Sequence, residues 1–335
     1  MKLNNKFVIL TSFYNAEDYL AQSAKHSILQ GYDDLGIIFI NDGSTDYSKD
    51  VLFAEITGNL GGNISQSGSS LVWTGLANGK NIIYTENTTN VGCAALNQKI
   101  AVDTYINNTG TICGIVDGDD WLNDGDAVSF VVDNMGASYD MYQSTHYKSM
   151  ESVSVPYKLS NHPLTEINIT GEDVPITIRE QGWHCEHFRA FRKYLSDAVD
   201  TGRSFIDPTG GLIKPASDVA YFIPMMEMAT PNRILTTQVN HYTYRYDNPI
   251  NDHWIYQGKQ NQNAKYVLYP ISGVDFATGS GEAFLEKHTC EESYFLENAG
   301  NFSGMSGDQS GFYIWHKGGY DIGSTGCWTP YEPLN

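Results

Sequence analysis

Four short apolar segments, each followed by polar residues, constrain the fold of this chain more than any other feature. They cover residues 7–11, 36–40, 81–85 and 112–116. Each has the length and composition of a strand that is buried on both faces. Helical patterns separate them, over residues 16–31 and 92–104. Strands and helices that alternate in this way predict an α/β fold, with a parallel sheet and right-handed crossovers.

Polar residues gather where three of these strands end, in the segments Thr11–Asn15, Asn41–Asp46 and Asp117–Asp120. In open parallel sheets, ligands bind beyond the carboxyl ends of the strands. The sequence therefore predicts one binding site along this edge of the sheet. Within the second segment, Ser44 or Thr45 is expected to cap the helix that follows.

The acidic turn after the fourth strand is the most informative of these segments. It contains Asp117, Asp119 and Asp120 around Gly118. Carboxylates this close together repel one another unless one is protonated or a cation lies between them. Mg²⁺ and Mn²⁺ prefer oxygen ligands and usually bind through one or two carboxylates and a substrate phosphate. Gly118 leaves room for a ligand. An acidic turn that binds nothing stays an alternative, because such turns are common.

Composition narrows the classes of partner. The 335 residues carry a formal net charge of -19, with 39 acidic and 20 basic side chains, which disfavours nucleic acids and anionic membranes. Five cysteines without a CxxC pair indicate reduced thiols, and we expect a cytoplasmic protein. We expect neither a signal peptide nor a membrane-spanning segment, since no apolar run approaches the necessary length.

Four motifs, in order, resemble the signature of family 2 glycosyltransferases with the GT-A fold. They are Leu10–Asn15, Asn41–Asp46, Asn90–Gly92 with Asn97, and Asp117–Asp120. The resemblance covers residues 6–135, apart from an insertion over residues 58–80 that reads as a loop or small hairpin. It implies a Rossmann-like mixed sheet with helices on both faces, as in other enzymes that use nucleotide-diphospho-sugars.

The resemblance also implies a domain organisation. We expect a GT-A domain over residues 1–248, with a nucleotide-sugar half at 1–135 and an acceptor half at 136–248. Residues 249–335 are rich in Gly and aromatic residues, and we expect an irregular C-terminal appendage there.

The resemblance assigns donor-binding roles to individual residues. Thr11 and Tyr14 would line the nucleobase pocket, and Asp42 would bind the edge of the base. Asn90 and Gly118 would also contact the nucleotide-sugar.

The resemblance implies a Mn²⁺ or Mg²⁺ cofactor as well. Asp119 would ligate the ion on the diphosphate, and Asp117 would contact the ribose or bridge to the ion. His241 is a further candidate ligand, although a lone histidine is more often structural. Family members often carry Arg where this chain has Leu96, so a donor-side cation would come from Lys99 or from the second half of the chain.

The acceptor side carries weaker signals. Residues 181–192 resemble the family segment that borders the acceptor, which makes Trp183, His187 and Arg189 candidate acceptor-binding residues. Helical patterns cover residues 189–198 and 218–229. Asp218 resembles the carboxylate that acts as general base, and the alternative is that it complements the N-terminus of its helix.

These expectations describe a metal-dependent inverting glycosyltransferase. It would move a sugar from a nucleotide-sugar, with UDP favoured by the family, to a hydroxyl-bearing acceptor such as a glycan or glycoconjugate. Two alternatives keep the scaffold: transfer to a hydroxylated DNA base, or an inactive scaffold that binds glycans. A nucleotidyltransferase is disfavoured, because such enzymes need a Gly-rich basic loop after the first strand and Thr11–Asn15 has neither feature.

Overall fold

The computed structural model describes most of the chain, in segments separated by gaps. These are residues 2–150, 153–157, 178–179, 183, 185–207, 210–229, 231–249, 255–268, 313–316 and 327–330. The chain forms two compact units whose segments alternate along the sequence. The first unit contains Met1–Pro175, His184–Ala198 and Met225–Asn248, and the second contains Ile176–Trp183, Val199–Pro224 and Pro249–Asn335.

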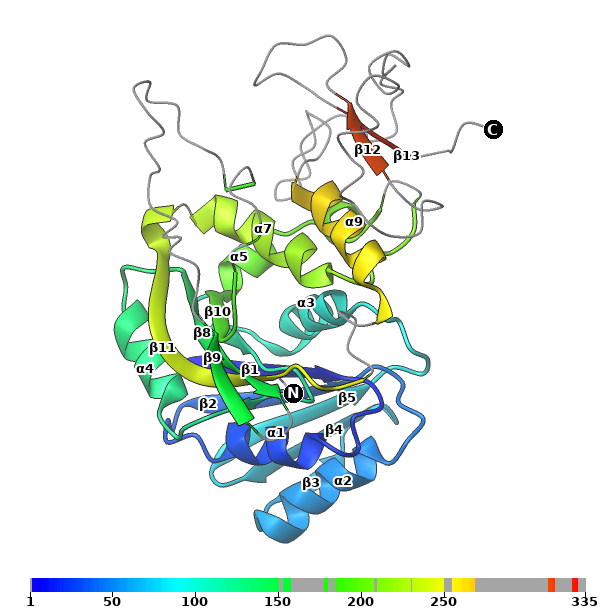
Figure 1. Cartoon of the computed structure of the whole chain (residues 1–335). Coiled ribbons are helices and arrows are strands. Elements are labelled where there is room, and N and C mark those ends of the chain that lie inside the picture. The colour runs from blue at the N-terminus through cyan, green and yellow to red at the C-terminus, as the bar shows by residue number, and fades with distance from the viewer. Residues whose placement is uncertain are drawn as a thin grey trace. The chain divides into compact units, whose positions relative to one another are not determined.

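The centre of the first unit is the parallel sheet that the sequence predicts (Figure 1). Its strands, in spatial order, are β5 (Lys80–Glu86), β2 (Leu35–Asn41), β1 (Phe7–Phe13) and β6 (Ile112–Ile115). All three pairings are parallel, which confirms the expected topology. Every residue of β1, β2 and β6 is buried, as expected for apolar strands covered on both faces. Side chains of this kind contribute about 1.5–3 kcal/mol each when fully buried.

Helices cover both faces of this sheet. They are α1 (Leu20–Ile28), α2 (Ser48–Ala54), a π-helical turn (Glu55–Asn59), α3 (Ala94–Tyr105) and α4 (Ala127–Met135). Figure 1 shows α1 and α2 together on one side of the sheet and α3 on the other. In α1, Leu20, Ala24 and Ile28 are buried, and their spacing places them on one helical face.

The inserted segment forms a β-hairpin at one edge of the sheet. Its strands β3 (Asn63–Gln66) and β4 (Val72–Ala77) pair with each other, and β4 continues the sheet by pairing antiparallel with β5. The Trp73 ring packs edge-on against Phe53 and Tyr84, with centroid separations of 5.9 and 5.2 Å. The Lys49 ammonium lies 3.6 Å from the Trp73 ring centroid. The hairpin is therefore held against both α2 and β5.

Further strands complete the sheet, which has both parallel and antiparallel pairings. They are β7 (Trp121–Leu122), β8 (Met141–Met150), β9 (Val153–Tyr157), β10 (Arg189–Arg192) and β11 (Ile234–Arg245). β10 pairs antiparallel with β6, so the helix predicted over residues 189–198 is wrong in its first part. The helix α5 occupies only Lys193–Asp197. Because β11 pairs with β7, residues after 240 lie next to the acidic turn.

The second unit is described in shorter pieces. They are α6 (Thr201–Ser204), the part of α7 (Ser217–Ala229) up to Pro224, α9 (Gln257–Leu268) and the hairpin of β12 (Tyr313–His316) and β13 (Cys327–Pro330). Asn263 on α9 donates a hydrogen bond to the Pro215 carbonyl at 2.9 Å, which joins α9 to the start of α7. Most of the expected appendage over residues 249–335 lies outside the described residues. Among the described helices, none is long and apolar enough to cross a bilayer.

Candidate functional site

The loops after β1 and β2 fasten each other at the carboxyl edge of the sheet. The Asn15 amide donates to Ser44 Oγ at 3.0 Å, and the Thr45 amide donates to Asn15 Oδ1 at 2.8 Å. The expectation that Ser44 or Thr45 caps α2 is therefore wrong. The helix begins at Ser48, whose amide donates to Asp46 Oδ1 at 3.0 Å. The hydrogen bonds between the two loops hold them together at the edge of the sheet where the polar motifs lie.

Asp42 builds the loop that contains the third motif. Its buried carboxylate accepts hydrogen bonds from the Val91 amide at 2.9 Å, the Gly92 amide at 2.8 Å and Asn87 Nδ2 at 2.7 Å. The neighbouring Gly43 has a φ of +72°, and an added Cβ would lie 2.6 Å from a backbone carbon of Thr89. The second and third motifs thus form one structure, and binding of a base edge by Asp42 stays a prediction.

The other predicted donor residues differ in their exposure. Thr11 is fully buried, and its hydroxyl has no hydrogen-bond partner within the described part of the chain. Tyr14 is 40% exposed, and Asn90 is exposed as well, so both are accessible to a ligand. An added Cβ on Gly118 would lie 2.4 Å from Phe13 Cβ. Close packing against β1 therefore requires glycine at this position, which is a different reason from the expected approach of a ligand.

The end of β11 holds the acidic turn in place. Asp120 is fully buried, and its carboxylate accepts the Tyr242 hydroxyl at 2.6 Å and the Arg245 amide at 2.7 Å. Asp119 accepts Asn248 Nδ2 at 2.6 Å on its carboxylate and Arg245 Nε at 3.0 Å on its carbonyl. Sequence reasoning did not identify Tyr242 or Asn248 as site residues. Residues Tyr244–Asp247 resemble a later segment of family 2 glycosyltransferases, and this resemblance was the available signal in the sequence.

The negatively charged carboxylates of this turn repel one another. Burial, followed by the charges of Asp119 and Asp117, raises the pKa of Asp120 well above its usual value. Burial also raises the pKa of Asp119, and the hydrogen bond from Asn248 opposes that rise. A bound divalent cation would remove the conflict by favouring the ionised forms.

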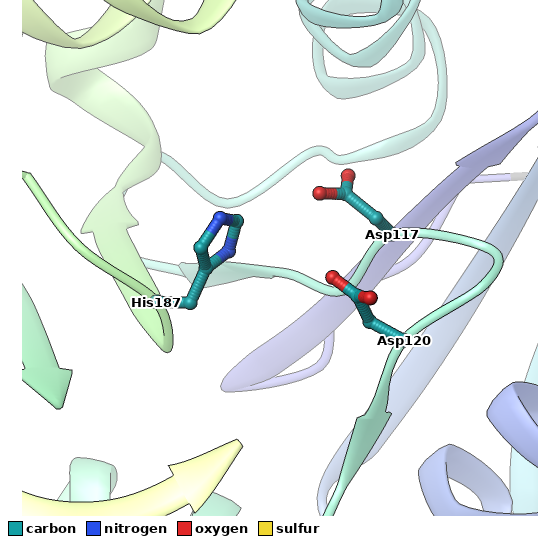
Figure 2. Close-up of side chains that lie close together, drawn as sticks. All are labelled: Asp117, Asp120 and His187. Atoms are coloured by element: carbon teal, nitrogen blue, oxygen red, sulfur yellow. The ribbon is translucent and has the colours of Figure 1, made fainter. Parts of the chain in front are cut away.

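A group of three residues could hold such a cation. Asp117, Asp120 and His187 each offer one ligand atom, and these atoms lie within 4.8 Å of one another. Figure 2 shows the His187 ring turned toward the two carboxylates. Two oxygen donors with mutual repulsion fit Mg²⁺ or Mn²⁺. Asp117 is in this group, whereas Asp119, the other carboxylate predicted to bind the ion, is not, and its role as a ligand stays a prediction.

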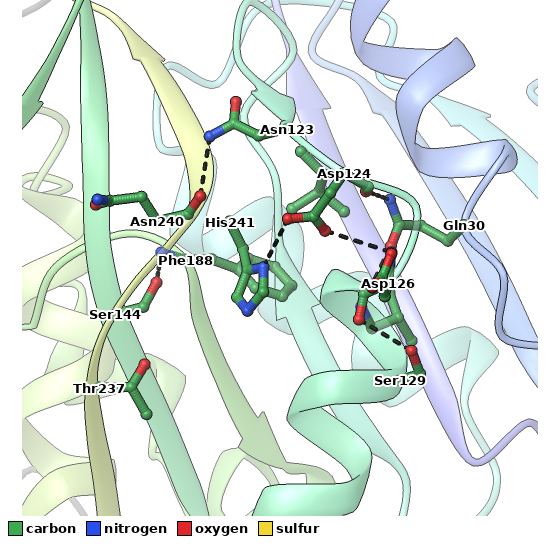
Figure 3. A network of polar contacts seen from close by, with 12 residues as sticks. Gln30, Asn123, Asp124, Asp126, Ser129, Ser144, Phe188, Thr237, Asn240 and His241 are labelled. Carbon is green, nitrogen blue, oxygen red and sulfur yellow. Dashed lines mark hydrogen bonds and ion pairs between the residues drawn. The ribbon is translucent and has the colours of Figure 1, made fainter.

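His241, the other predicted metal ligand, lies elsewhere. Its Nδ1 is 2.9 Å from Asp124 Oδ2 (Figure 3). Its ring packs on Phe130 with a centroid separation of 4.7 Å. Successive side chains of a strand point to opposite faces. Because Tyr242 faces Asp120, its neighbour His241 faces away from the acidic turn.

His187 and Arg189 lie together beside the acidic turn. An Arg189 guanidinium nitrogen is 3.0 Å from His187 Nε2. Burial and the charges of Arg189 and His146 lower the pKa of His187 well below its usual value, so the imidazole is neutral near pH 7. Lys99, expected to replace the cation missing at Leu96, is buried and bonded to Asp103 at 2.6 Å. The acceptor role of His187 and Arg189 stays a prediction.

The remaining predicted residues, Asp218 and Trp183, belong to the second unit. Asp218 lies in the first turn of α7, where its Oδ1 accepts the Val219 amide at 2.9 Å. That position fits a helix N-terminus, and the role of general base stays a prediction. Trp183 is half-buried.

Comparison with solved structures finds several similar proteins. TarS 1-349 from S. aureus is 17% identical, with a TM-score of 0.48 over 72% of this chain and 60% of that one. A structure of TarS 1-349 in complex with UDP-GlcNAc gives 17% identity and a TM-score of 0.47, over 72% and 58% of the two chains. Mannosyltransferase PcManGT from Pyrobaculum calidifontis, in complex with GDP-Man and Mn²⁺, is 13% identical, with a TM-score of 0.48 over 78% and 62%. This chain thus spans about three-fifths of each of these structures.

A comparison with curated proteins finds no match. The model of the family described as "Glycosyl transferase family 2" matches residues 8–200, more than half of the chain. The matched segment includes the two fastened loops, the Asp42-centred loop, the acidic turn and His187. With the mixed sheet and the acidic turn at its carboxyl edge, the chain belongs to glycosyltransferase family 2 and has the GT-A fold.

Proposed function

We propose that this glycosyltransferase is metal dependent and inverting, and that it moves a sugar from a UDP-sugar to a hydroxyl of a glycan or glycoconjugate. The observation that carries the proposal is the pair Asp117 and Asp120, whose carboxylates lie within 4.8 Å of each other at the carboxyl end of β6. A divalent cation held by these carboxylates would supply positive charge against the charge that grows on the departing diphosphate.

The nucleotide would lie along the fastened loops. Tyr14 is exposed enough to stack on a base. Asp42 is buried, and its amide donates to the carbonyl of Phe13, the residue before Tyr14, at 2.9 Å. UDP is proposed from the family resemblance, since an Asp carboxylate suits the imide N–H of uracil. Asp42 already accepts three hydrogen bonds, so its orientation is fixed before the base arrives.

Asp218 is proposed as the general base. The acceptor hydroxyl would give its proton to this carboxylate while its oxygen attacks the anomeric carbon and the bond to the diphosphate breaks. A single displacement of this kind inverts the anomeric configuration. General-base catalysis contributes about 10²–10⁴-fold to the rate.

The experiment measures UDP release from a panel of UDP-sugars and glycan acceptors during a Mn²⁺ titration. Asp120→Asn should abolish metal-dependent turnover and Mn²⁺ binding, and Asp218→Asn should lower kcat about 10²–10⁴-fold with unchanged UDP affinity. Asp133→Asn, an exposed change on α4, is the matched control. Unaltered Mn²⁺ binding in Asp120→Asn would refute metal dependence through this turn.

A further inference from the structure

The contact between Arg189 and His187 determines which nitrogen of the imidazole carries a proton. Arg189 stays protonated and has no acceptor atom, so it must donate across the 3.0 Å contact to His187 Nε2. A neutral imidazole has one nitrogen lone pair, and this hydrogen bond uses it. The proton of His187 therefore lies on Nδ1.

Aromatic packing holds the ring in this orientation. The His187 ring stacks on Tyr242 at 4.8 Å with an interplanar angle of 19°, and on Tyr244 at 5.4 Å with an angle of 15°. His146 meets it edge-on at 5.7 Å. His187 Nδ1 is buried and has no hydrogen-bond partner among the described residues. The structure thus holds a neutral N–H donor, without an acceptor, beside Asp117 and Asp120.

This arrangement is the opposite of the one that metal-bound histidines need. A ligating histidine offers the metal a lone pair and donates its other N–H to a carboxylate, carbonyl or water. Here a cation, Arg189, lies where that acceptor would be. His187 lies within reach of the two carboxylates but lacks the lone pair that a metal requires.

We infer that His187 presents its Nδ1–H to a negatively charged oxygen of the UDP-sugar diphosphate, with Arg189 as the positive charge behind it, while Asp117 and Asp120 hold the ion. The inference rests on the proposed function and deepens it. It also explains how this chain can have Leu96 where family members often carry Arg. The Arg189–His187 pair supplies the positive charge and the N–H donor for the diphosphate, which Leu96 and the Asp103-bound Lys99 do not. Hydrogen bonds that involve a charged group are stronger than neutral ones.

Three measurements test this assignment. Nitrogen-15 NMR of histidine-labelled wild-type protein, with His187→Phe used to assign the signal, should show the proton on Nδ1. Calorimetry with Mn²⁺ alone should give His187→Phe an affinity within about threefold of wild type. UDP at saturating Mn²⁺ should bind His187→Phe and Arg189→Met about 10- to 100-fold more weakly, as expected for one lost charged hydrogen bond. Phe keeps the stack on Tyr242 and Tyr244.

Asp120→Asn is the comparison variant, because it should lose Mn²⁺ affinity at least tenfold. Any one of three results would overturn the inference. The first is a proton on Nε2 of His187. The others are a loss of Mn²⁺ affinity in His187→Phe equal to that of Asp120→Asn, and an unchanged UDP affinity in His187→Phe. A wild-type protein that binds no UDP would overturn the proposed function as well. Should His187→Phe not fold, His187→Gln would assign the NMR signal in its place, and the position of the proton would decide.

Discussion

The Tyr242 hydroxyl lies 2.6 Å from Asp120 Oδ2 and joins β11 to the acidic turn across 122 residues of sequence. The same hydroxyl accepts the Asp117 amide at 3.1 Å. One buried phenol thus contacts both the carboxylate of Asp120 and the backbone of Asp117, the two residues proposed to hold the ion. Its position follows from the pairing of Tyr242 with Leu122 between β11 and β7.

Replacing Tyr242 by Phe should lower the free energy of unfolding by about 1–3 kcal/mol, because a buried carboxylate loses a hydrogen-bond donor and the Asp117 amide loses its acceptor. Urea denaturation measures the change. Tyr105→Phe is the matched control, since the Tyr105 hydroxyl makes a longer contact, 3.2 Å to Thr85, on α3. An equal loss of unfolding free energy in the two variants would mean that the Tyr242 contact stabilises the protein no more than the Tyr105 contact does.

Asp120→Asn should make the metal-free protein more stable near pH 8. The raised pKa of Asp120 means that the folded state binds its proton more tightly than the unfolded state, whose value is about 3.9. The stability that Asp120 contributes is therefore fully present below that value and is lost as pH rises through the folded-state pKa. The difference in stability between the variant and the wild type should become smaller as pH falls. Melting temperatures measured at several pH values would show this.

Added Mn²⁺ should reverse this order near pH 8, because binding to the folded wild type stabilises it by mass action. The Asp120→Asn variant should gain little. A melting temperature that rises equally in both proteins would place the ion elsewhere.

Asp42→Ala should loosen the loop of the third motif. The change removes the acceptor for the Val91 and Gly92 amides and for Asn87. Hydrogen exchange should show faster exchange at these two amides, whereas amides in the centre of β1 keep their protection. UDP affinity should fall in parallel. Unchanged exchange at Val91 and Gly92 would contradict the organising role of this carboxylate.

Gly118→Ala should destabilise the protein by about 1–3 kcal/mol through overpacking, because the new methyl would lie 2.4 Å from Phe13 Cβ. Gly58→Ala is the control, since no atom lies within 4 Å of an added Cβ there. Denaturation curves compare the two. A ligand-only role for Gly118 would instead leave stability unchanged and affect UDP binding alone.

The local elements could be predicted because they depend on local patterns. The apolar runs at 7–11, 36–40 and 81–85 are too short and too continuous for amphipathic helices, and all three are strands of the sheet. The Gly/Ser/Asn-rich insertion was expected to be a loop or a small hairpin, and it forms a hairpin. Residues 189–192 were mistaken for a helix because a strand buried between β6 and β8 carries no pattern that separates it from a buried helical turn.

The sequence by itself determined the parallel α/β core, the carboxyl-edge position of the candidate site and the acidic turn. These features depend on the alternation of strands and helices and on the residues of single turns, which short stretches of sequence show. Only the tertiary structure decided which carboxylates lie close enough together to hold a cation. Asp120 rather than Asp119 lies with Asp117 in that group, and the turn is held by Tyr242 of β11 and by Asn248 just after that strand, more than a hundred residues away in sequence. His187 reached the turn in the same way, through pairing of β10 with β6, and long-range pairing of this kind leaves no trace in local sequence.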